Sequence, residues 1–290
     1  MTESVYRTGV VGCGTMGAGI TEVCLRAGLD VRVLVSSAHR VDDARRRVTA
    51  GLRRAVAKGR MTPDEHEAAL GRLRITPDPA ELADRQLVVE ATSEELHLKR
   101  AVFKTLDHHL ADPTAVLAST TSSLLVNDLA EATGRPASVV GLHFFNPVPA
   151  MPLVELVLTD RTSEHTAATA ETFAADTLGK EVIRTRDRCG FVVNALLVPY
   201  LMAAVRMYDQ GVADAEDIDR GMTLGCGYPM GPLALLDMIG IDTITSVARG
   251  MRDNDTDLIT EVPPLLTRMV EEGRLGRKSG WGFYRYDGGS

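Results

Sequence analysis

Short apolar runs alternate with stretches of helical periodicity over the first half of the chain. Runs rich in valine and leucine end at 10–11 and occupy 31–35, 87–91, 115–119 and 139–143. Runs this short are typical of strands that are buried on both faces of a parallel sheet. Helical patterns lie between them at 16–27, 40–58 and 94–109, and Thr62–Glu65 has the pattern of a capping box. The alternation predicts a doubly wound, Rossmann-type α/β domain.

The pattern changes after Pro152. The segments 154–158 and 181–185 predict two further strands, which could be antiparallel, and 163–178 predicts a helix closed by Gly179. From Phe191 onward the chain is mostly helical in pattern, with helices expected at 191–210, 214–222, 233–239 and 265–272. We therefore expect an α/β domain over residues 1–187 and an all-α domain over residues 188–290.

Composition and charge narrow the classes of function. The 290 residues are 44% hydrophobic and 24% charged, which is ordinary for a globular protein, and the net charge of -7 argues against a nucleic-acid partner. No apolar run reaches the ~18 residues of a membrane span, and the first residues lack a signal-peptide layout. The four cysteines show neither metal-ligand spacing nor a disulfide framework. These features predict a cytoplasmic protein without a metal site.

A glycine-rich motif follows the first apolar run and opens a helix. Residues 12–17, Gly-Cys-Gly-Thr-Met-Gly, fit G-x-G-x-x-G in the strand–turn–helix context that this fingerprint requires. Gly12 allows a tight turn, Gly14 allows close approach of a pyrophosphate, and Gly17 allows the helix to pack closely. The helix dipole then faces the phosphates. The motif predicts a dinucleotide held at Gly12, Gly14, Thr15, Met16 and Gly17.

The acidic residue that usually binds the ribose 2′-hydroxyl is missing from this sequence. It is expected about 20 positions beyond the glycines, where we find Val35. Without a carboxylate, Ser36, Ser37 and Arg40 could bind a 2′-phosphate. NADP and NAD are therefore both candidate cofactors, with a slight preference for NADP. Alternatively, Arg40 only caps or solvates the next helix.

A histidine and a glutamate form the candidate catalytic pair. His143 closes a predicted strand at the carboxyl edge of the sheet, where such sheets bind ligands. Glu155 follows twelve positions later inside an apolar strand, where an acid is costly unless it is paired. A carboxylate would fix the imidazole tautomer, and histidine can accept a proton near neutral pH. On its own, however, His143 could be a core histidine.

Six motifs in order give the chain a family resemblance over nearly its whole length. They are GCGTMGAGI at 12–20, ASTTSS at 118–123, GLHFFNP at 141–147, GFVVN at 190–194, PMGP at 229–232 and GWGFY at 280–284. The chain resembles the 3-hydroxyacyl-CoA dehydrogenases, and its length is similar to the single-function 3-hydroxybutyryl-CoA dehydrogenases of fatty acid metabolism. The resemblance implies an oxidoreductase that forms a homodimer through its helical domain.

The resemblance also implies roles for individual residues. Ser122, His143, Glu155 and Asn194 would be catalytic, with His143 as the general base oriented by Glu155. Glu94, Lys99, Asn146 and Lys278 would contact the cofactor, and the region from Gly51 to Lys58 would contact the acyl carrier.

Alternatives remain for several of these residues. Ser122 and Asn194 could be helix caps, and Lys99 could be an exposed partner of Glu95 at i, i+4. The arginines at 45–47 and 53–54 are typical of a solvated helix face, although a few could meet a nucleotide phosphate of coenzyme A.

The carrier of the acyl group is also open at this point. Departures from the family pattern, among them Gly51 where some members have serine, allow two carriers. One is coenzyme A, and the other is an acyl carrier protein that bears a glyceryl or hydroxymalonyl unit for polyketide biosynthesis. A non-catalytic dinucleotide-binding sensor is the alternative from another class of protein.

Overall fold

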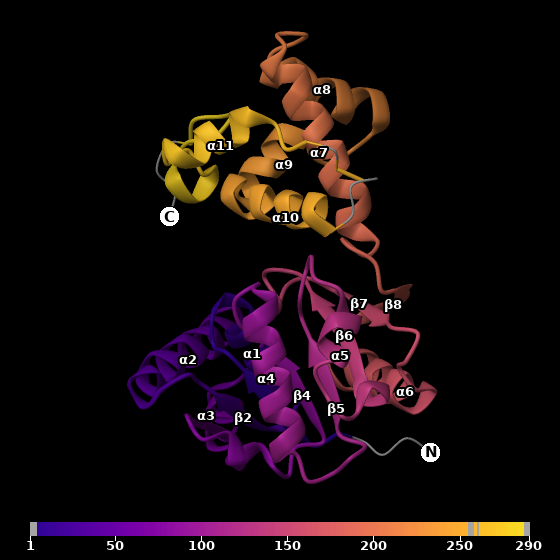
Figure 1. Cartoon of the computed structure of the whole chain (residues 1–290). Helices are drawn as coiled ribbons and strands as arrows, with labels where there is room; N and C mark the ends of the chain where they lie inside the picture. Colours follow the sequence, from indigo (N-terminus) through magenta and orange to yellow (C-terminus); the bar gives the residue numbers. More distant parts are fainter. Residues whose placement is uncertain (1–4, 255–257, 260, 287–290) are drawn as a thin grey trace. The chain divides into compact units, whose positions relative to one another are not determined.

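The chain folds into two units, each with its own core. The computed structural model describes residues 5–254, 258–259 and 261–286. The first unit spans Met1–Arg188 and the second spans Cys189–Ser290 (Figure 1). The first unit is a sheet covered by helices and the second is helical, so the predicted fold class, a Rossmann-type domain followed by an all-α domain, is confirmed.

The sheet of the first unit has the strand order β3-β2-β1-β4-β5-β6-β7-β8. The strands are β1 (Arg7–Val11), β2 (Asp30–Leu34), β3 (Leu73–Thr76), β4 (Leu87–Glu90), β5 (Val116–Ser119), β6 (Val139–Phe144), β7 (Leu153–Leu158) and β8 (Glu181–Arg186). The first six are parallel, and all residues of β4, β5 and β6 are buried, as their short apolar runs predict. β7 is antiparallel to β6, whereas β8 runs parallel to β7.

Six α-helices connect the strands within the described part of this unit. They are α1 (Thr15–Arg26), α2 (Val41–Ala57), α3 (Pro63–Gly71), α4 (Leu96–His109), α5 (Val126–Ala130) and α6 (Glu164–Thr172). Buried side chains of α1, α2 and α6 share one core with the sheet, while α4 packs against α5 (Figure 1). The capping box of α3 is present, since Thr62 and Glu65 bond reciprocally. The predicted helix over 163–178 is α6 followed by a π-helical turn, Phe173–Thr177.

The sequence patterns missed three elements. β3 is a four-residue edge strand with an exposed arginine at its second position, so its apolar run is too short to stand out. α5 has only five residues, and its first two N–H groups, of Val126 and Asn127, donate to the distant carboxylate of Asp187. α10 (Ile241–Asn254) follows α9 (Pro232–Ile239) after a single glycine, Gly240 with φ +110°, which leaves little turn signal between the two helices.

The second unit contains α7 (Val193–Asp209), α8 (Ala215–Cys226), α9, α10 and α11 (Pro264–Glu271). Buried carboxylates fix its C-terminal segment: Asp237 accepts hydrogen bonds from the backbone N–H groups of Phe283 and Tyr284 at 2.9 and 3.0 Å. The apolar residues of α7 differ in burial: Leu201 and Val205 are fully buried, whereas Leu196 is 73% exposed. No helix among the described residues has the length and apolar character that crossing a bilayer requires.

Candidate active site

The candidate site residues of the first unit gather at one edge of the sheet. The glycine motif follows β1, Ser36 and Ser37 follow β2, Glu94 follows β4, and Ser122 follows β5. His143 lies near the end of β6. Because these five strands are parallel, their carboxyl ends meet at the same edge. The strand order also reverses beside β1, which is the position where open α/β sheets bind ligands.

The glycine motif forms a cradle at the start of α1. Gly12 has φ +91°, and a Cβ there would lie 2.7 Å from the carbonyl oxygen of Ala91. At Gly17 a Cβ would lie 2.1 Å from the carbonyl oxygen of Gly12, so this glycine lets the helix pack on the loop itself. A Cβ at Gly14 meets nothing within 4 Å, so its absence leaves room for a ligand. Thr15 is exposed, and the first turn of α1 has no acidic residue. These features fit a dinucleotide pyrophosphate.

The end of β2 carries no acidic side chain at the positions predicted for ribose binding. Val35 is 6% exposed and packs in the core. The exposed position is the next residue, Ser36, and Ser37 and Arg40 follow it on the surface. Ser37 contacts His39 through Oγ and Nε2 at 3.3 Å. The conclusion for the cofactor is unchanged, because the position that faces solvent also lacks a carboxylate.

The predicted His143–Glu155 pair is present and buried. The two residues are direct cross-strand partners on β6 and β7, with His143 4% and Glu155 0% exposed. Nδ1 of His143 lies 2.6 Å from Oε2 of Glu155. The ring of Phe145 lies 4.6 Å from the imidazole, centroid to centroid. With Nδ1–H donating to the carboxylate, the lone pair of the neutral ring lies on Nε2, which can take up a proton.

Glu94 organises the loop that carries Ser122. Its Oε1 accepts hydrogen bonds from the backbone N–H of Ser122 at 2.7 Å and of Ser123 at 3.0 Å. The hydroxyls of Thr121, Ser122 and Ser123 donate to the same oxygen. Burial alone raises the pKa of Glu94, but the positive charge of Lys99 and these hydrogen bonds outweigh it, so the pKa is below its usual value. Glu94 is therefore a carboxylate that fixes the position of the half-buried Ser122.

Lys99 is not the exposed partner of Glu95 that its spacing allowed. Its side chain is 1% exposed, and its ammonium lies 2.9 Å from both carboxylate oxygens of Glu90, which is 0% exposed. Glu90 also accepts hydrogen bonds from Ser119 and Thr92. A further ion pair of 3.4 Å joins Lys99 to Glu94. The sequence analysis missed Glu90, since a single acid at the end of an apolar strand gives no signal of its partner.

The remaining predicted residues lie in two places. Asn146 is exposed in the loop after β6, and its side chain lines a groove together with Gly14 and Thr15. Asn194 and Lys278 belong to the second unit. Asn194 lies in the first turn of α7, and Lys278 pairs with Asp242 at 2.6 Å.

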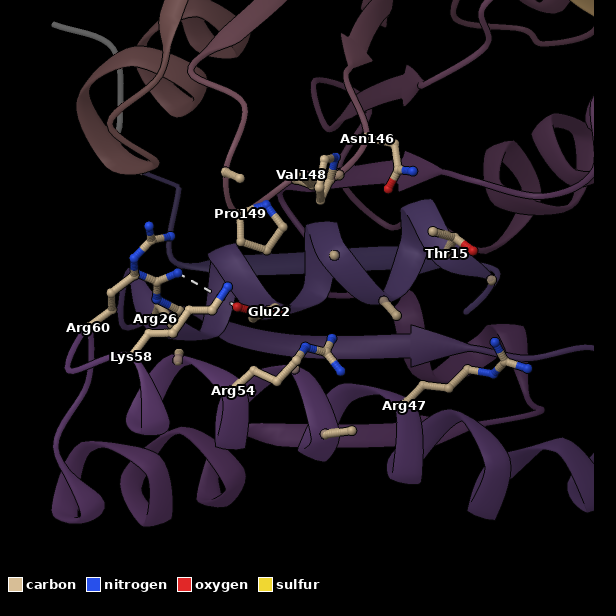
Figure 2. A pocket seen from close by; sticks show the side chains of 18 residues that line it. Thr15, Glu22, Arg26, Arg47, Arg54, Lys58, Arg60, Asn146, Val148 and Pro149 are labelled. Carbon is tan, nitrogen blue, oxygen red and sulfur yellow. Dashed lines mark ion pairs between the residues drawn. The ribbon is translucent and has the colours of Figure 1, made fainter. Parts of the chain in front are cut away.

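The groove has a volume of about 510 Å³ and lies between α1, α2 and the loop 146–150. Figure 2 shows a row of basic side chains along it: Arg26, Lys58 and Arg60 gather at one end, Arg54 lies in the middle, and Arg47 lies toward Thr15. Five basic residues against one acid, Glu22, give the groove a formal charge of 5 − 1 = +4 on a chain whose net charge is -7. The groove therefore favours an anionic ligand. Arg45, Arg46 and Arg53 do not line it and are exposed, as expected for a solvated face.

Among the described residues that line this groove, Glu22 is the one with an acidic side chain, and the sequence analysis did not single it out. It forms an ion pair of 3.6 Å with Arg26 (Figure 2). Burial raises its pKa, and the charges of Arg26 and Arg54 offset part of that effect. A Cβ at Gly51 would lie 2.3 Å from Oε2 of Glu22. A glycine at 51 is therefore what gives Glu22 its place on the wall of the groove.

Comparison with known proteins agrees with this geometry. Residues 7–188 match the model of the 3-hydroxyacyl-CoA dehydrogenase NAD binding domain, and residues 190–286 match the C-terminal domain of the same family. The chain is 50% identical to a 3-hydroxybutyryl-CoA dehydrogenase of Mycobacterium tuberculosis, over 99% of this chain and 100% of the relative. It is 41% identical to the human mitochondrial hydroxyacyl-coenzyme A dehydrogenase, over 96% and 90%.

A solved structure gives the same result. The (S)-3-hydroxybutyryl-CoA dehydrogenase of Ralstonia eutropha has a TM-score of 0.89 and 38% identity, with 98% of this chain and 100% of that chain covered. Both domain models and relatives of full length thus agree on one assignment. The chain belongs to the 3-hydroxyacyl-CoA dehydrogenase family.

Proposed function

We propose that the protein interconverts the 3-hydroxyl and 3-oxo groups of a short acyl-CoA, with His143 as the general base and Glu155 as the group that orients it. The observation that carries this proposal is the buried contact of 2.6 Å between His143 Nδ1 and Glu155 Oε2, at the sheet edge that also holds the dinucleotide cradle. Oxidation of the 3-hydroxyl group removes a proton from the oxygen and a hydride from C3, and Nε2 takes the proton. When bound, the nicotinamide supplies the acceptor for that hydride.

The surrounding residues support the same reaction. Glu94 holds Ser122 through its backbone N–H, so the Ser122 hydroxyl can turn from Glu94 and donate a hydrogen bond to the reacting oxygen. Asn194 keeps the catalytic role that the family resemblance implies. The carboxylate of Glu155 stabilises the imidazolium that forms when His143 takes the proton. The basic groove binds the phosphates of the carrier, which favours coenzyme A because that carrier brings its own phosphorylated nucleotide.

Carrier choice is tested with one acyl group on two carriers. We expect acetoacetyl-CoA to be reduced with a kcat/KM at least about tenfold above that of acetoacetyl-acyl carrier protein, because the nucleotide adds charge-assisted contacts in the groove. Steady-state rates at equal ionic strength measure the ratio. Turnover restricted to the protein-tethered substrate would replace the coenzyme A assignment with the polyketide-type one.

Cofactor choice is tested at the end of β2. We propose that the enzyme uses NAD(H) and also accepts NADP(H), since Ser36, Ser37 and Arg40 present no carboxylate to a 2′-phosphate. In the variant Ser36→Asp, the kcat/KM with NADPH is expected to fall about tenfold or more through charge repulsion, while that with NADH is retained. The matched control is Ser36→Asn, which adds the same bulk without charge. Equal losses in both variants would contradict an electrostatic origin.

A further inference from the structure

A second cavity of about 340 Å³ adjoins the basic groove. It is lined by Arg26, Arg60, Met61, Glu65, Ala68 and Arg72, and it shares Arg26 and Arg60 with the groove. These residues come from four segments: the end of α1, the loop after α2, the body of α3, and the turn before β3. Figure 2 places Arg26 and Arg60 together at the end of the groove away from Thr15. The cavity thus continues the groove beyond its far end.

The charges and hydrogen bonds of this cavity leave donors for a ligand. Three arginines and one acid, Glu65, are among the described residues that line it, and Glu65 already accepts hydrogen bonds from the backbone N–H of Thr62 at 2.7 Å and from its hydroxyl at 3.1 Å. Arg26 also pairs with Glu22 at 3.6 Å. Arg72 donates to the carbonyl oxygen of Leu25 through one terminal nitrogen. Its Nε is buried and has no hydrogen-bond partner within the described residues. A buried donor without a partner is costly, and Arg72 carries it at the wall of this cavity.

We propose that this cavity is a binding site for a phosphate monoester. A monoester carries close to two negative charges at neutral pH and three acceptor oxygens, which suits a cavity lined by three arginines. A phosphodiester, as found between a carrier protein and its pantetheine arm, carries only one charge. Two sources have the required chemistry: the terminal 3′-phosphate of a coenzyme A molecule lying in the groove, which rests on the proposed function, and free inorganic phosphate.

Kinetics on Arg60→Gln test the first source. Arg60 is exposed and lies between the groove and the cavity, so its replacement leaves the core intact. In the wild type we expect the KM of acetoacetyl-3′-dephospho-CoA to exceed that of acetoacetyl-CoA by about tenfold or more. Arg60→Gln is expected to reduce this ratio several-fold by raising the KM of the 3′-phosphorylated substrate more than that of the dephospho substrate. The matched control is Arg53→Gln, which is exposed on α2 outside both cavities and should keep the wild-type ratio.

Calorimetric titration tests the site without turnover. Adenosine 3′,5′-bisphosphate and inorganic phosphate are titrated into the wild type, Arg60→Gln, Arg26→Gln and Arg53→Gln. If Arg60→Gln and Arg26→Gln weaken binding of the bisphosphate and Arg53→Gln does not, the result supports a phosphate carried by coenzyme A. The same pattern with inorganic phosphate supports the free anion. The proposal is overturned if the two thioesters have equal KM and neither anion distinguishes the variants. A wild type that binds the bisphosphate but reduces no thioester would refute the proposed function and leave the phosphate site standing.

Discussion

Replacing His143 with glutamine is expected to lower kcat about 10²–10⁴-fold, the range that general acid–base catalysis contributes. Glutamine can still donate a hydrogen bond to Glu155, so the buried carboxylate keeps a partner. It has no nitrogen lone pair that accepts the hydroxyl proton at Nε2. Because the glycine cradle lies after β1 and not on β6, dinucleotide affinity should be unchanged. Steady-state reduction of acetoacetyl-CoA gives kcat, and titration of NADH fluorescence gives the affinity.

His97 offers a matched control for this substitution. Its side chain is 83% exposed, and His97→Gln should retain wild-type turnover. A companion variant, Glu155→Gln, keeps the size of the side chain but removes the charge that orients and stabilises the imidazolium, and a large loss of kcat is expected there as well. If His143→Gln retained turnover, the base would have to be another group. A protein that never turned over substrate but bound NADH in all variants would be a dinucleotide sensor.

The fold could be predicted well where the chain encodes it locally. The apolar run at 31–35 coincides with β2, and those at 87–91 and 139–143 coincide with β4 and β6, in which every residue is buried. A strand that is buried on both faces is mostly apolar, so its run is visible in the sequence. The capping box at Thr62 predicted the start of α3, because both of its hydrogen bonds join residues only three positions apart in the sequence. The sequence patterns missed β3 and α5, because elements of four or five residues are too short to show a period. In addition, α5 begins with hydrogen bonds to Asp187, about sixty residues away.

The candidate site shows the same contrast between residues that a local pattern reveals and residues that only folding brings together. The glycine motif and the His143–Glu155 pair combine a local pattern with one tertiary step, so the sequence was sufficient to expect them. Val35 lies in the core, and the sequence did not show that the first exposed position after β2 is Ser36. Glu90 gave no signal, since its partner Lys99 is brought close by folding. Ion pairs that depend on tertiary contacts are the part of this site that single-sequence reasoning misses.

The Glu90–Lys99 pair therefore gives the second large expected effect. Replacing Glu90 with glutamine is expected to lower the free energy of unfolding by about 3 kcal/mol, the lower end of the range for breaking a buried ion pair, because the buried Lys99 would lose its nearer counter-charge and keep only Glu94, at 3.4 Å. The new amide would also place an N–H₂ group against donors from Lys99 and Ser119. Chemical denaturation followed by circular dichroism measures the loss. Since Lys99 also pairs with Glu94, the loop that holds Ser122 should loosen and kcat should fall in the molecules that stay folded.

A double variant separates the charge from the packing. In Glu90→Gln/Lys99→Met both charges are gone, and replacing a buried ion pair by uncharged groups of similar size is often close to neutral. We therefore expect the double variant to recover much of the stability that Glu90→Gln loses. Its kcat should stay low, because Glu94 has lost the ammonium that helps to hold it at the serine loop. A double variant as unstable as the single one would show that the hydrogen bonds from Thr92 and Ser119, not the ion pair, make Glu90 essential.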